Sequence, residues 1–214
     1  MAKLSVSILS CYDILTGINQ LNKTDCDYIH IDVMDGKFVS NSFDPYESLK
    51  DYQQYLKKPI DVHLMVNDVK PYIEKYKDLT PEYITIQAEI DEKIEETIAL
   101  IHKIGCKAGI SLKPSTPLST IEKQLPQLDL VLVMTVEPGS GGQTFQKDMV
   151  PKITALKQMI TNQKRKAIIQ VDGGINEDTA KLAIDAGADL LVSGSFVTSG
   201  IMEEQVKKLK RIEK

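Results

Sequence analysis

Eight short runs rich in β-branched residues recur along the 214-residue chain, and the stretches between them are long enough to hold helices. Such runs predict β-strands, and their regular alternation with helical stretches predicts parallel strands joined by crossover helices. The predicted strands cover residues 3–10, 27–34, 60–65, 82–88, 107–112, 128–136, 167–172 and 190–193.

Eight β/α units in a chain of this length favour a closed (β/α)8 barrel, the TIM-barrel fold of the α/β class. The rhythm alone also allows a doubly wound open sheet. No glycine- or serine-rich linker and no shift in composition divides the chain, so we predict a single barrel domain over residues 1–214. Residues 203–214 carry apolar side chains at roughly helical spacing, which predicts a closing helix there.

Local signals mark several predicted helix boundaries. Asn176 is expected to cap one helix, and Gly105 is expected to end another. Thr116 followed by Pro117 predicts a further helix start, with the proline at the first helical position.

The charge balance limits the possible partners. The formal net charge is −4, which argues against nucleic-acid binding. Arg165 and Arg211 are the only arginines, so bidentate phosphate clamps are scarce. Any phosphate site must therefore rely on backbone amides.

The cysteines and the apolar runs bear on location. Three cysteines without paired spacing, Cys11, Cys26 and Cys106, indicate a reducing compartment. No run approaches the roughly 18 apolar residues of a membrane helix, and the apolar stretch at residues 4–9 is too short and serine-rich for a signal peptide. We expect a cytoplasmic chain with no membrane partner.

Four potential metal ligands fall at the C-terminal ends of predicted strands, where barrel enzymes carry their sites. They are His30, Asp32, His63 and Asp172. His30 and Asp32 are two residues apart, so both side chains point to the same side of one strand. A lone strand histidine is more often a hydrogen-bonded core residue, but two imidazoles and two carboxylates together suit Zn2+, Mn2+, Fe2+ or Co2+. The third histidine, His102, is expected at the surface, and Asp35 is expected to form a turn.

Glycine-rich turns follow the last three predicted strands. They are residues 138–142 (PGSGG), Gly173–Gly174 and Gly194–Ser195. Glycine lets backbone N–H groups approach an anion closely, and late barrel loops commonly bind phosphate. One such turn carries little information, but three in succession predict a phosphate site.

At these residues the chain resembles the ribulose-phosphate 3-epimerase family, collinearly from about residue 4 to 197. The matching segments are residues 7–10 (SILS), 30–36 (HIDVMDG), 61–65 (DVHLM), 134–145 (MTVEPGSGGQTF), 171–176 (VDGGIN) and 187–195. The resemblance implies one divalent metal ion per subunit, with Zn2+ favoured and Fe2+, Mn2+ or Co2+ as alternatives. It also leads us to expect a homo-oligomer.

The resemblance assigns roles to individual residues. The implied metal ligands are His30, Asp32, His63 and Asp172, with Asp32 and Asp172 as the acid/base pair. The implied substrate contacts are Ser7 and His63 on the sugar, and Gly141, Gly142, Gly174, Gly194 and Ser195 at the phosphate. Met34, Met65 and Met134 resemble a sulfur-lined pocket around the reacting carbons, although methionines are also common core filler.

The implied reaction is the interconversion of D-ribulose 5-phosphate and D-xylulose 5-phosphate by two-base proton transfer through an ene-diolate. A second possibility is another ketose phosphate, such as D-allulose 6-phosphate, because its epimerases share the metal and phosphate motifs. A third is a sugar-phosphate-binding paralogue without useful turnover. A metal-free barrel lyase or isomerase would leave His30 and His63 without a role.

Gln87 departs from the family pattern, which usually shows a histidine at this position. It shares a strand face with Thr85, so we expect it to line the pocket at the barrel mouth near the metal site. There its amide would hydrogen-bond with the sugar or with a metal ligand, without binding the metal itself. On this hypothesis Gln87 influences which sugar phosphate is turned over.

Overall fold

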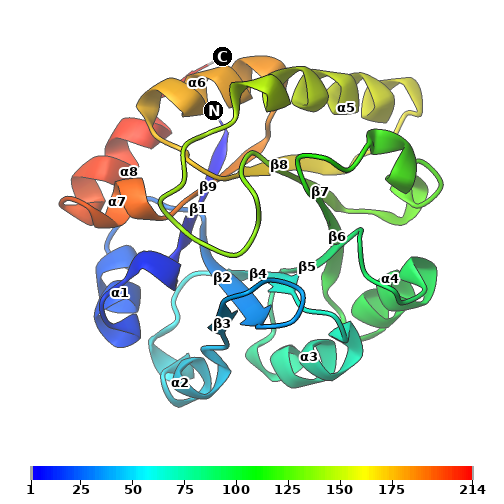
Figure 1. The fold of residues 1–214 in the computed structure, drawn as a ribbon. Helices are drawn as coiled ribbons and strands as arrows, with labels where there is room; N and C mark the ends of the chain where they lie inside the picture. The colour runs from blue at the N-terminus through cyan, green and yellow to red at the C-terminus, as the bar shows by residue number, and fades with distance from the viewer. Residues whose placement is uncertain (1, 214) are drawn as a thin grey trace.

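The computed structural model describes residues 2–213, in which eight parallel strands close into a barrel (Figure 1). Each strand pairs in parallel with its neighbours, and β1 pairs with both β9 and β2, which closes the ring. The barrel strands are β1 (Lys3–Ser7), β2 (Tyr28–Asp35), β4 (Ile60–Met65), β5 (Tyr83–Gln87), β6 (Lys107–Leu112), β7 (Leu130–Met134), β8 (Ile168–Asp172) and β9 (Leu190–Ser193). The predicted barrel is confirmed, and the open sheet is excluded.

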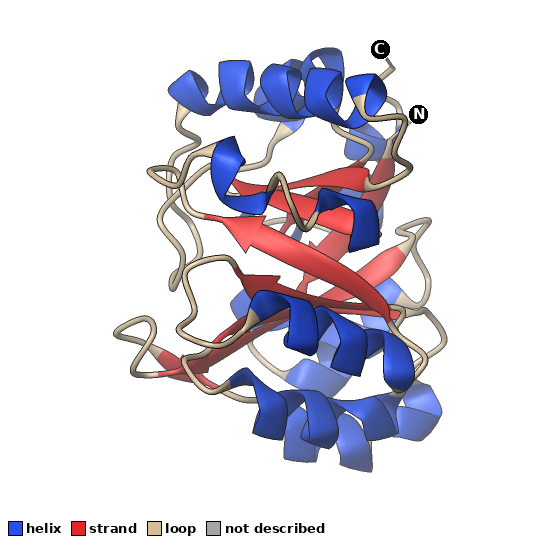
Figure 2. Ribbon diagram, turned by 90° about the vertical axis from the view of Figure 1, so that its right-hand side faces the viewer, coloured by secondary structure: helices blue, strands red, loops and turns tan. Residues whose placement is uncertain are grey.

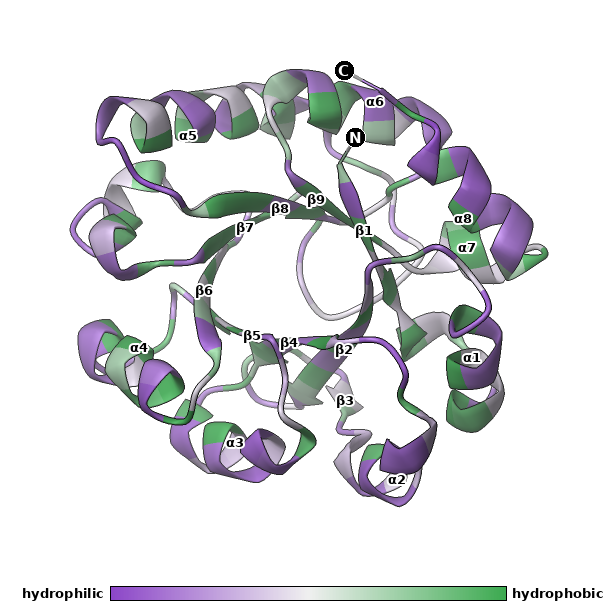
Figure 3. Ribbon diagram, turned by 180° about the vertical axis from the view of Figure 1, so that it is seen from behind, coloured by the Kyte–Doolittle hydropathy of each residue, from purple (hydrophilic) through white to green (hydrophobic). Residues whose placement is uncertain are grey.

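Helices surround the ring of strands, with their apolar faces turned towards it and their polar faces outward (Figure 3). They are α1 (Ile14–Leu21), α2 (Tyr46–Asp51), α3 (Val69–Tyr76), α4 (Ile94–Lys103), α5 (Val150–Asn162), α6 (Glu177–Ala186), α7 (Ser195–Thr198) and α8 (Met202–Lys210). Seen from the side, they flank the strands above and below (Figure 2). None of the helices within residues 2–213 has the length and apolar character needed to cross a membrane.

Strand alternation separates two cores. On β2, Ile29, Ile31 and Val33 belong to the large cluster between the sheet and the helices. The side chains between them point into the barrel, where His30 is fully buried and Asp32 is 5% exposed. A smaller apolar cluster fills part of the interior, with Leu130, Leu132, Met134, Tyr28, Tyr83, Val136 and Leu190. The interior is therefore apolar along β7 and polar along β2.

The segment between β6 and β7 differs from the prediction. Within the described chain it forms two 3-10 turns, η4 (Leu118–Ile121) and η5 (Leu125–Gln127), in place of an α-helix. Pro117 precedes η4 as its N-cap, and the Thr116 hydroxyl donates to Glu89 rather than capping a helix. Pro126 prevents a helix from running on through this segment, because a proline inside a helix removes a backbone donor and clashes with the carbonyl four residues earlier.

Other local predictions agree with the structure. The Asn176 side chain accepts from the backbone N–H groups of Asp178 and Thr179 in a capping box at the start of α6. Gly105 follows the end of α4 with a φ of +85°. The first strand is shorter than predicted, because the chain turns into the 3-10 helix η1 (Ile8–Ser10) after Ser7. That turn brings Ser7 to the barrel mouth.

Candidate active site

Four side chains able to bind a cation converge inside the barrel. His30 and Asp32 come from β2, His63 from β4 and Asp172 from the last position of β8. One nitrogen or oxygen atom from each lies within 4.8 Å of the others. Strand register contributes to this convergence, because Asp32 is the Cα partner of His63 on the neighbouring strand. The structure thus brings together the four residues predicted as metal ligands.

The facing atoms of this cluster suit a cation. His30 Nε2 lies 3.5 Å from Asp32 Oδ1, and His63 Nδ1 lies 3.6 Å from the same oxygen, which is too far for good hydrogen bonds. Both nitrogens are buried and have no hydrogen-bond partner among residues 2–213. Buried polar atoms without partners are costly, and a divalent cation would satisfy both of these at once. The donor set therefore fits a metal such as Zn2+, Mn2+, Fe2+ or Co2+.

Asp61 lies directly behind His30. Its Oδ2 is 2.8 Å from His30 Nδ1, so the other ring nitrogen, Nε2, faces the cluster. The same oxygen accepts hydrogen bonds from Ser5 Oγ, at 3.2 Å, and from Gln170 Nε2. A carboxylate behind a metal-binding imidazole fixes the ring's orientation and tautomer. The sequence analysis missed Asp61, although its place two residues before His63 on the same strand face is a usable signal.

Gln87 lies behind His63, and this corrects its predicted place. Its Nε2 is 2.8 Å from His63 Nε2, and its side chain is fully buried. Neither Gln87 nor His63 is among the residues lining the pocket in the described part of the chain. The expected contact between Gln87 and one of the predicted metal ligands, His63, is present, but the expected place at the barrel mouth is wrong. For the same reason, the structure gives no support to a sugar contact by His63.

Burial and neighbouring charges drive the pKa values of the cluster apart. Burial, together with the charge of Asp32, raises the pKa of Asp172 to about 6. Burial also acts to raise the pKa of Asp32, but the two imidazoles outweigh it and hold that pKa far below its ordinary value. Burial disfavours the imidazolium of His30, yet the carboxylates of Asp61 and Asp32 raise its pKa well above the usual range. The protonation of each group therefore depends on the charge of the others.

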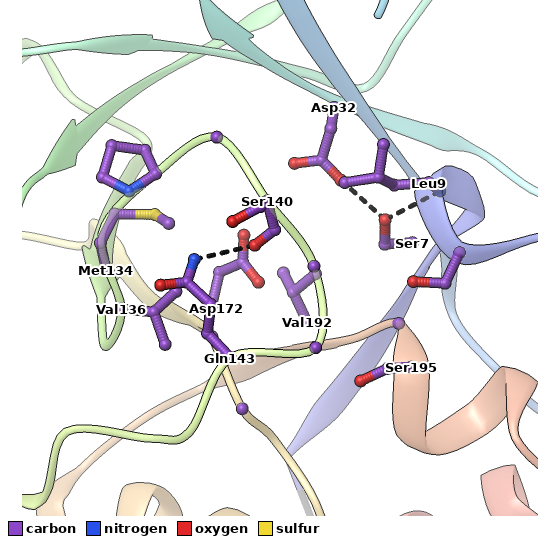
Figure 4. Close-up of a pocket in the computed structure, with 18 of the residues that line it drawn as sticks. Ser7, Leu9, Asp32, Met134, Val136, Ser140, Gln143, Asp172, Val192 and Ser195 are labelled. Carbon is purple, nitrogen blue, oxygen red and sulfur yellow. Dashed lines mark hydrogen bonds between the residues drawn. The ribbon is translucent and has the colours of Figure 1, made fainter. Parts of the chain in front are cut away.

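A pocket opens from this cluster to the barrel mouth, with Asp32 and Asp172 in its lining (Figure 4). Ser7 Oγ donates a 2.7 Å hydrogen bond to Asp32 Oδ2 and so fixes that carboxylate. The lining includes almost all of the remaining predicted site residues, namely Ser7, Met34, Met65, Met134, Gly141, Gly142, Gly174, Gly194 and Ser195. Ser10, Gln143 and Val192 also line it and were not predicted.

The loop between β7 and α5 crosses the open end of the barrel (Figure 1). Gln143 Nε2 donates to the carbonyls of Glu137 and Ser140, at 2.7 and 2.9 Å, and so draws the loop into a compact turn. Asn41 Nδ2 donates to the carbonyl of Gly139 at 2.7 Å, which ties the loop to the segment after β2. The glycine-rich wall is therefore held by side-chain amides that donate to its backbone carbonyls.

Two polar residues outside the cluster match their predictions. His102 lies on α4 with 42% of its side chain exposed, and its Nε2 is 2.9 Å from Asp129 Oδ2. Asp35 accepts hydrogen bonds from the backbone N–H groups of Lys37 and Phe38, each at 2.8 Å, and so forms the predicted turn.

Fold and site together define a barrel protein with a cluster of potential cation ligands beneath a glycine-walled pocket. Residues 3–198 match the model of the ribulose-phosphate 3 epimerase family. Among its relatives, the ribulose-phosphate 3-epimerase of Bacillus subtilis is 42% identical over 200 residues, covering 92% of each chain. That of Methanocaldococcus jannaschii is 39% identical over 199 residues, covering 92% of this chain and 84% of the other. The chain belongs to the ribulose-phosphate 3-epimerase family, a family of isomerases, as the resemblance predicted.

Solved structures of other activities share the fold. The 3-hexulose-6-phosphate synthase of Salmonella typhimurium superposes with a TM-score of 0.68 at 20% identity, covering 98% of this chain and 97% of that one. A tryptophan synthase from Mycobacterium tuberculosis gives 0.67 at 14% identity, covering 97% and 91%. At such low identity these likenesses concern the barrel alone.

Proposed function

We propose that the chain is a metal-dependent 3-epimerase that interconverts D-ribulose 5-phosphate and D-xylulose 5-phosphate. The observation that carries the proposal is the convergence of His30, Asp32, His63 and Asp172 beneath the glycine-walled pocket. The family and the relatives' names support the same reaction.

The four cluster residues would hold one divalent cation, with Zn2+ favoured. Two buried imidazole nitrogens without partners and two carboxylates supply the ligands. When bound, the cation supplies positive charge that stabilises the negative charge developing on the substrate oxygens. Asp61 holds His30 in the orientation that this role requires.

Asp32 and Asp172 would transfer the proton. They lie on β2 and β8, strands that β1 and β9 separate, and both line the pocket. One carboxylate removes the C3 proton from one face to give an ene-diolate, and the other carboxylic acid returns a proton to the opposite face, which inverts C3. The hydrogen bond from Ser7 keeps Asp32 aimed into the pocket. A paralogue that only bound sugar phosphate would have no need for two such carboxylates.

The glycine-rich wall would take the phosphate. Gly141, Gly142, Gly174, Gly194 and Ser195 line the pocket from three successive loops. Close backbone approach to an anion is possible there because no side chains intervene at the glycines. This placement suits a chain with two arginines, since backbone donors replace guanidinium groups.

The buried place of Gln87 bears on the choice of substrate. Its departure from the family pattern was the main sequence-level argument for a different sugar. Because Gln87 lies behind His63, it does not reach the pocket lining within residues 2–213. The residue therefore gives no reason to prefer D-allulose 6-phosphate.

Metal analysis of protein purified without chelator, combined with turnover assays, tests the proposal. We expect about one equivalent of transition metal per chain, and a kcat/KM for D-ribulose 5-phosphate at least about tenfold above that for D-allulose 6-phosphate, since 1.4 kcal/mol corresponds to tenfold. A reversed preference would reassign the substrate. Full turnover without metal would overturn the mechanism.

The homo-oligomer and the cytoplasmic location stay predictions. Light scattering on the purified protein and fractionation of the source cells would test them.

A further inference from the structure

The side-chain amide of Gln87 contacts the imidazole of His63. Gln87 Nε2 lies 2.8 Å from His63 Nε2, and the donor of this pair depends on the tautomer of His63. With the amide nitrogen towards the ring, His63 Nε2 would accept and the ring proton would sit on Nδ1. That nitrogen is the one that faces Asp32 and the cluster.

A metal-binding imidazole needs the opposite tautomer. If Nδ1 gives its lone pair to a cation, the ring proton must lie on Nε2, where it requires an acceptor. The Gln87 carbonyl oxygen, Oε1, is such an acceptor, and it is buried without a hydrogen-bond partner in the described chain. Rotating the amide by half a turn exchanges Oε1 and Nε2 at almost constant volume.

We propose that Gln87 is a positioning residue whose Oε1 accepts a hydrogen bond from His63 Nε2–H when a cation is bound. The amide then holds Nδ1 of His63 towards the metal. This inference rests on the proposed function, because it takes His63 as a metal ligand. It gives Gln87 a role at the metal rather than at the sugar.

Asp61 stands in the corresponding place behind His30. An ionised carboxylate offers only acceptors, so it accepts from His30 Nδ1–H and leaves Nε2 facing the cluster.

The tautomer of His63 tests the contact directly. In protein labelled with ¹⁵N-histidine and loaded with one equivalent of Zn2+, NMR should show the Nε2–H tautomer at His63, assigned with a His63→Gln variant. An Nδ1–H tautomer in the loaded protein would overturn the proposal.

Zn2+ affinity, measured by competition with a chelating dye, tests the positioning role. Gln87→Met keeps the side-chain length without the acceptor and should weaken binding about 10- to 100-fold, as loss of an outer-shell partner does. Gln87→Glu should restore wild-type affinity within about threefold or exceed it, because its carboxylate is also an acceptor for His63 Nε2–H. Thr85→Val is the matched control: it removes a buried hydroxyl on the same strand face, one without a partner among residues 2–213, and should leave the affinity unchanged.

The outcomes separate this inference from the proposed function. A wild-type protein that binds no Zn2+ would contradict the proposed function itself. Wild-type binding with equal affinity in Gln87→Met would overturn only the role of Gln87, as would a Gln87→Glu variant as weak as Gln87→Met. If circular dichroism shows that Gln87→Met is unfolded, the wild-type tautomer and the Gln87→Glu affinity still decide.

Discussion

The floor and the wall of the pocket are built from different parts of the chain. The floor is the cluster of titratable side chains on strands, His30, Asp32, His63 and Asp172, placed by register and alternation; of these, Asp32 and Asp172 line the pocket itself. The wall consists largely of glycines in loops, several of them at positive φ, such as Gly142 at +74° and Gly174 at +65°. The floor presents ionisable side chains to the pocket, whereas the wall presents backbone groups.

This difference implies two kinds of dependence on sequence. At the floor, a change of one functional group alters charge and proton transfer while the barrel around it remains packed. At the wall, adding a side chain alters the shape of the loop, because the backbone itself fills the space. Floor substitutions should therefore act mainly on kcat, and wall substitutions mainly on KM and stability.

Removing the metal should give the largest effect. Exhaustive chelation should lower kcat by at least about 1,000-fold, since a cation contributes several kcal/mol to stabilising developing charge. The far-UV circular dichroism should stay unchanged, because the eight strands are packed by apolar residues around and within the barrel. Full activity in protein shown to be metal-free would mean that the reaction does not depend on a metal held by the floor residues.

Asp172→Asn should give the next largest effect. The substitution keeps the size of the side chain and one possible ligand oxygen but removes a proton-transfer group, so kcat should fall at least about a hundredfold. KM should change little, because the wall is untouched. The assay requires protein loaded with metal to the wild-type level. Near-normal turnover in such protein would contradict a mechanism with two carboxylates.

The floor was largely predictable from the sequence, since alternation alone places His30 and Asp32 on one strand face. The residues that lie behind the floor were less predictable. Asp61 was visible by the same alternation but was not recognised, while the place of Gln87 behind His63 depends on how β4 and β5 pack inside the ring. Strand alternation gives the face of a residue, but not its depth below the barrel mouth.

The wall was predictable in composition rather than in shape. The three glycine turns follow the strands as expected and line one pocket. The contacts that shape the longest loop come from Gln143 and Asn41, which carry no sequence signal of their own. The segment between β6 and β7 shows the same limit, because two 3-10 turns follow the predicted helix start at Pro117 in place of an α-helix.

Gly174→Ala should affect KM more than kcat. An added Cβ would lie 2.4 Å from the backbone nitrogen of Phe145, so the loop after β7 must shift. We expect KM to rise about tenfold, equivalent to one lost hydrogen bond of ~1.4 kcal/mol. The strained φ should also lower the free energy of unfolding by about 1–3 kcal/mol.

Gly105→Ala is the matched control for Gly174→Ala. Gly105 has a comparable φ of +85°, but none of the described atoms lies within 4 Å of its added Cβ, and it follows α4 outside the pocket. It should lose similar stability in chemical denaturation while its KM stays at the wild-type value. An equal rise of KM in both variants would mean that the rise is caused by general destabilisation rather than by a change in the shape of the wall.

Gln87→His should give the smallest effect on substrate choice. A residue in contact with the sugar would change the ratio of kcat/KM for D-ribulose 5-phosphate and D-allulose 6-phosphate by about fivefold or more, equivalent to about 1 kcal/mol. Gln87 is fully buried behind His63, and an imidazole there can still hydrogen-bond with His63, so we expect a change below about twofold. Met65→Leu is the positive comparison, because Met65 lines the pocket and should shift the ratio more. A tenfold change of this ratio in Gln87→His at unchanged metal content would show that position 87 influences substrate preference through the metal-holding side chains. Metal binding and substrate recognition would then not be separate functions of the site.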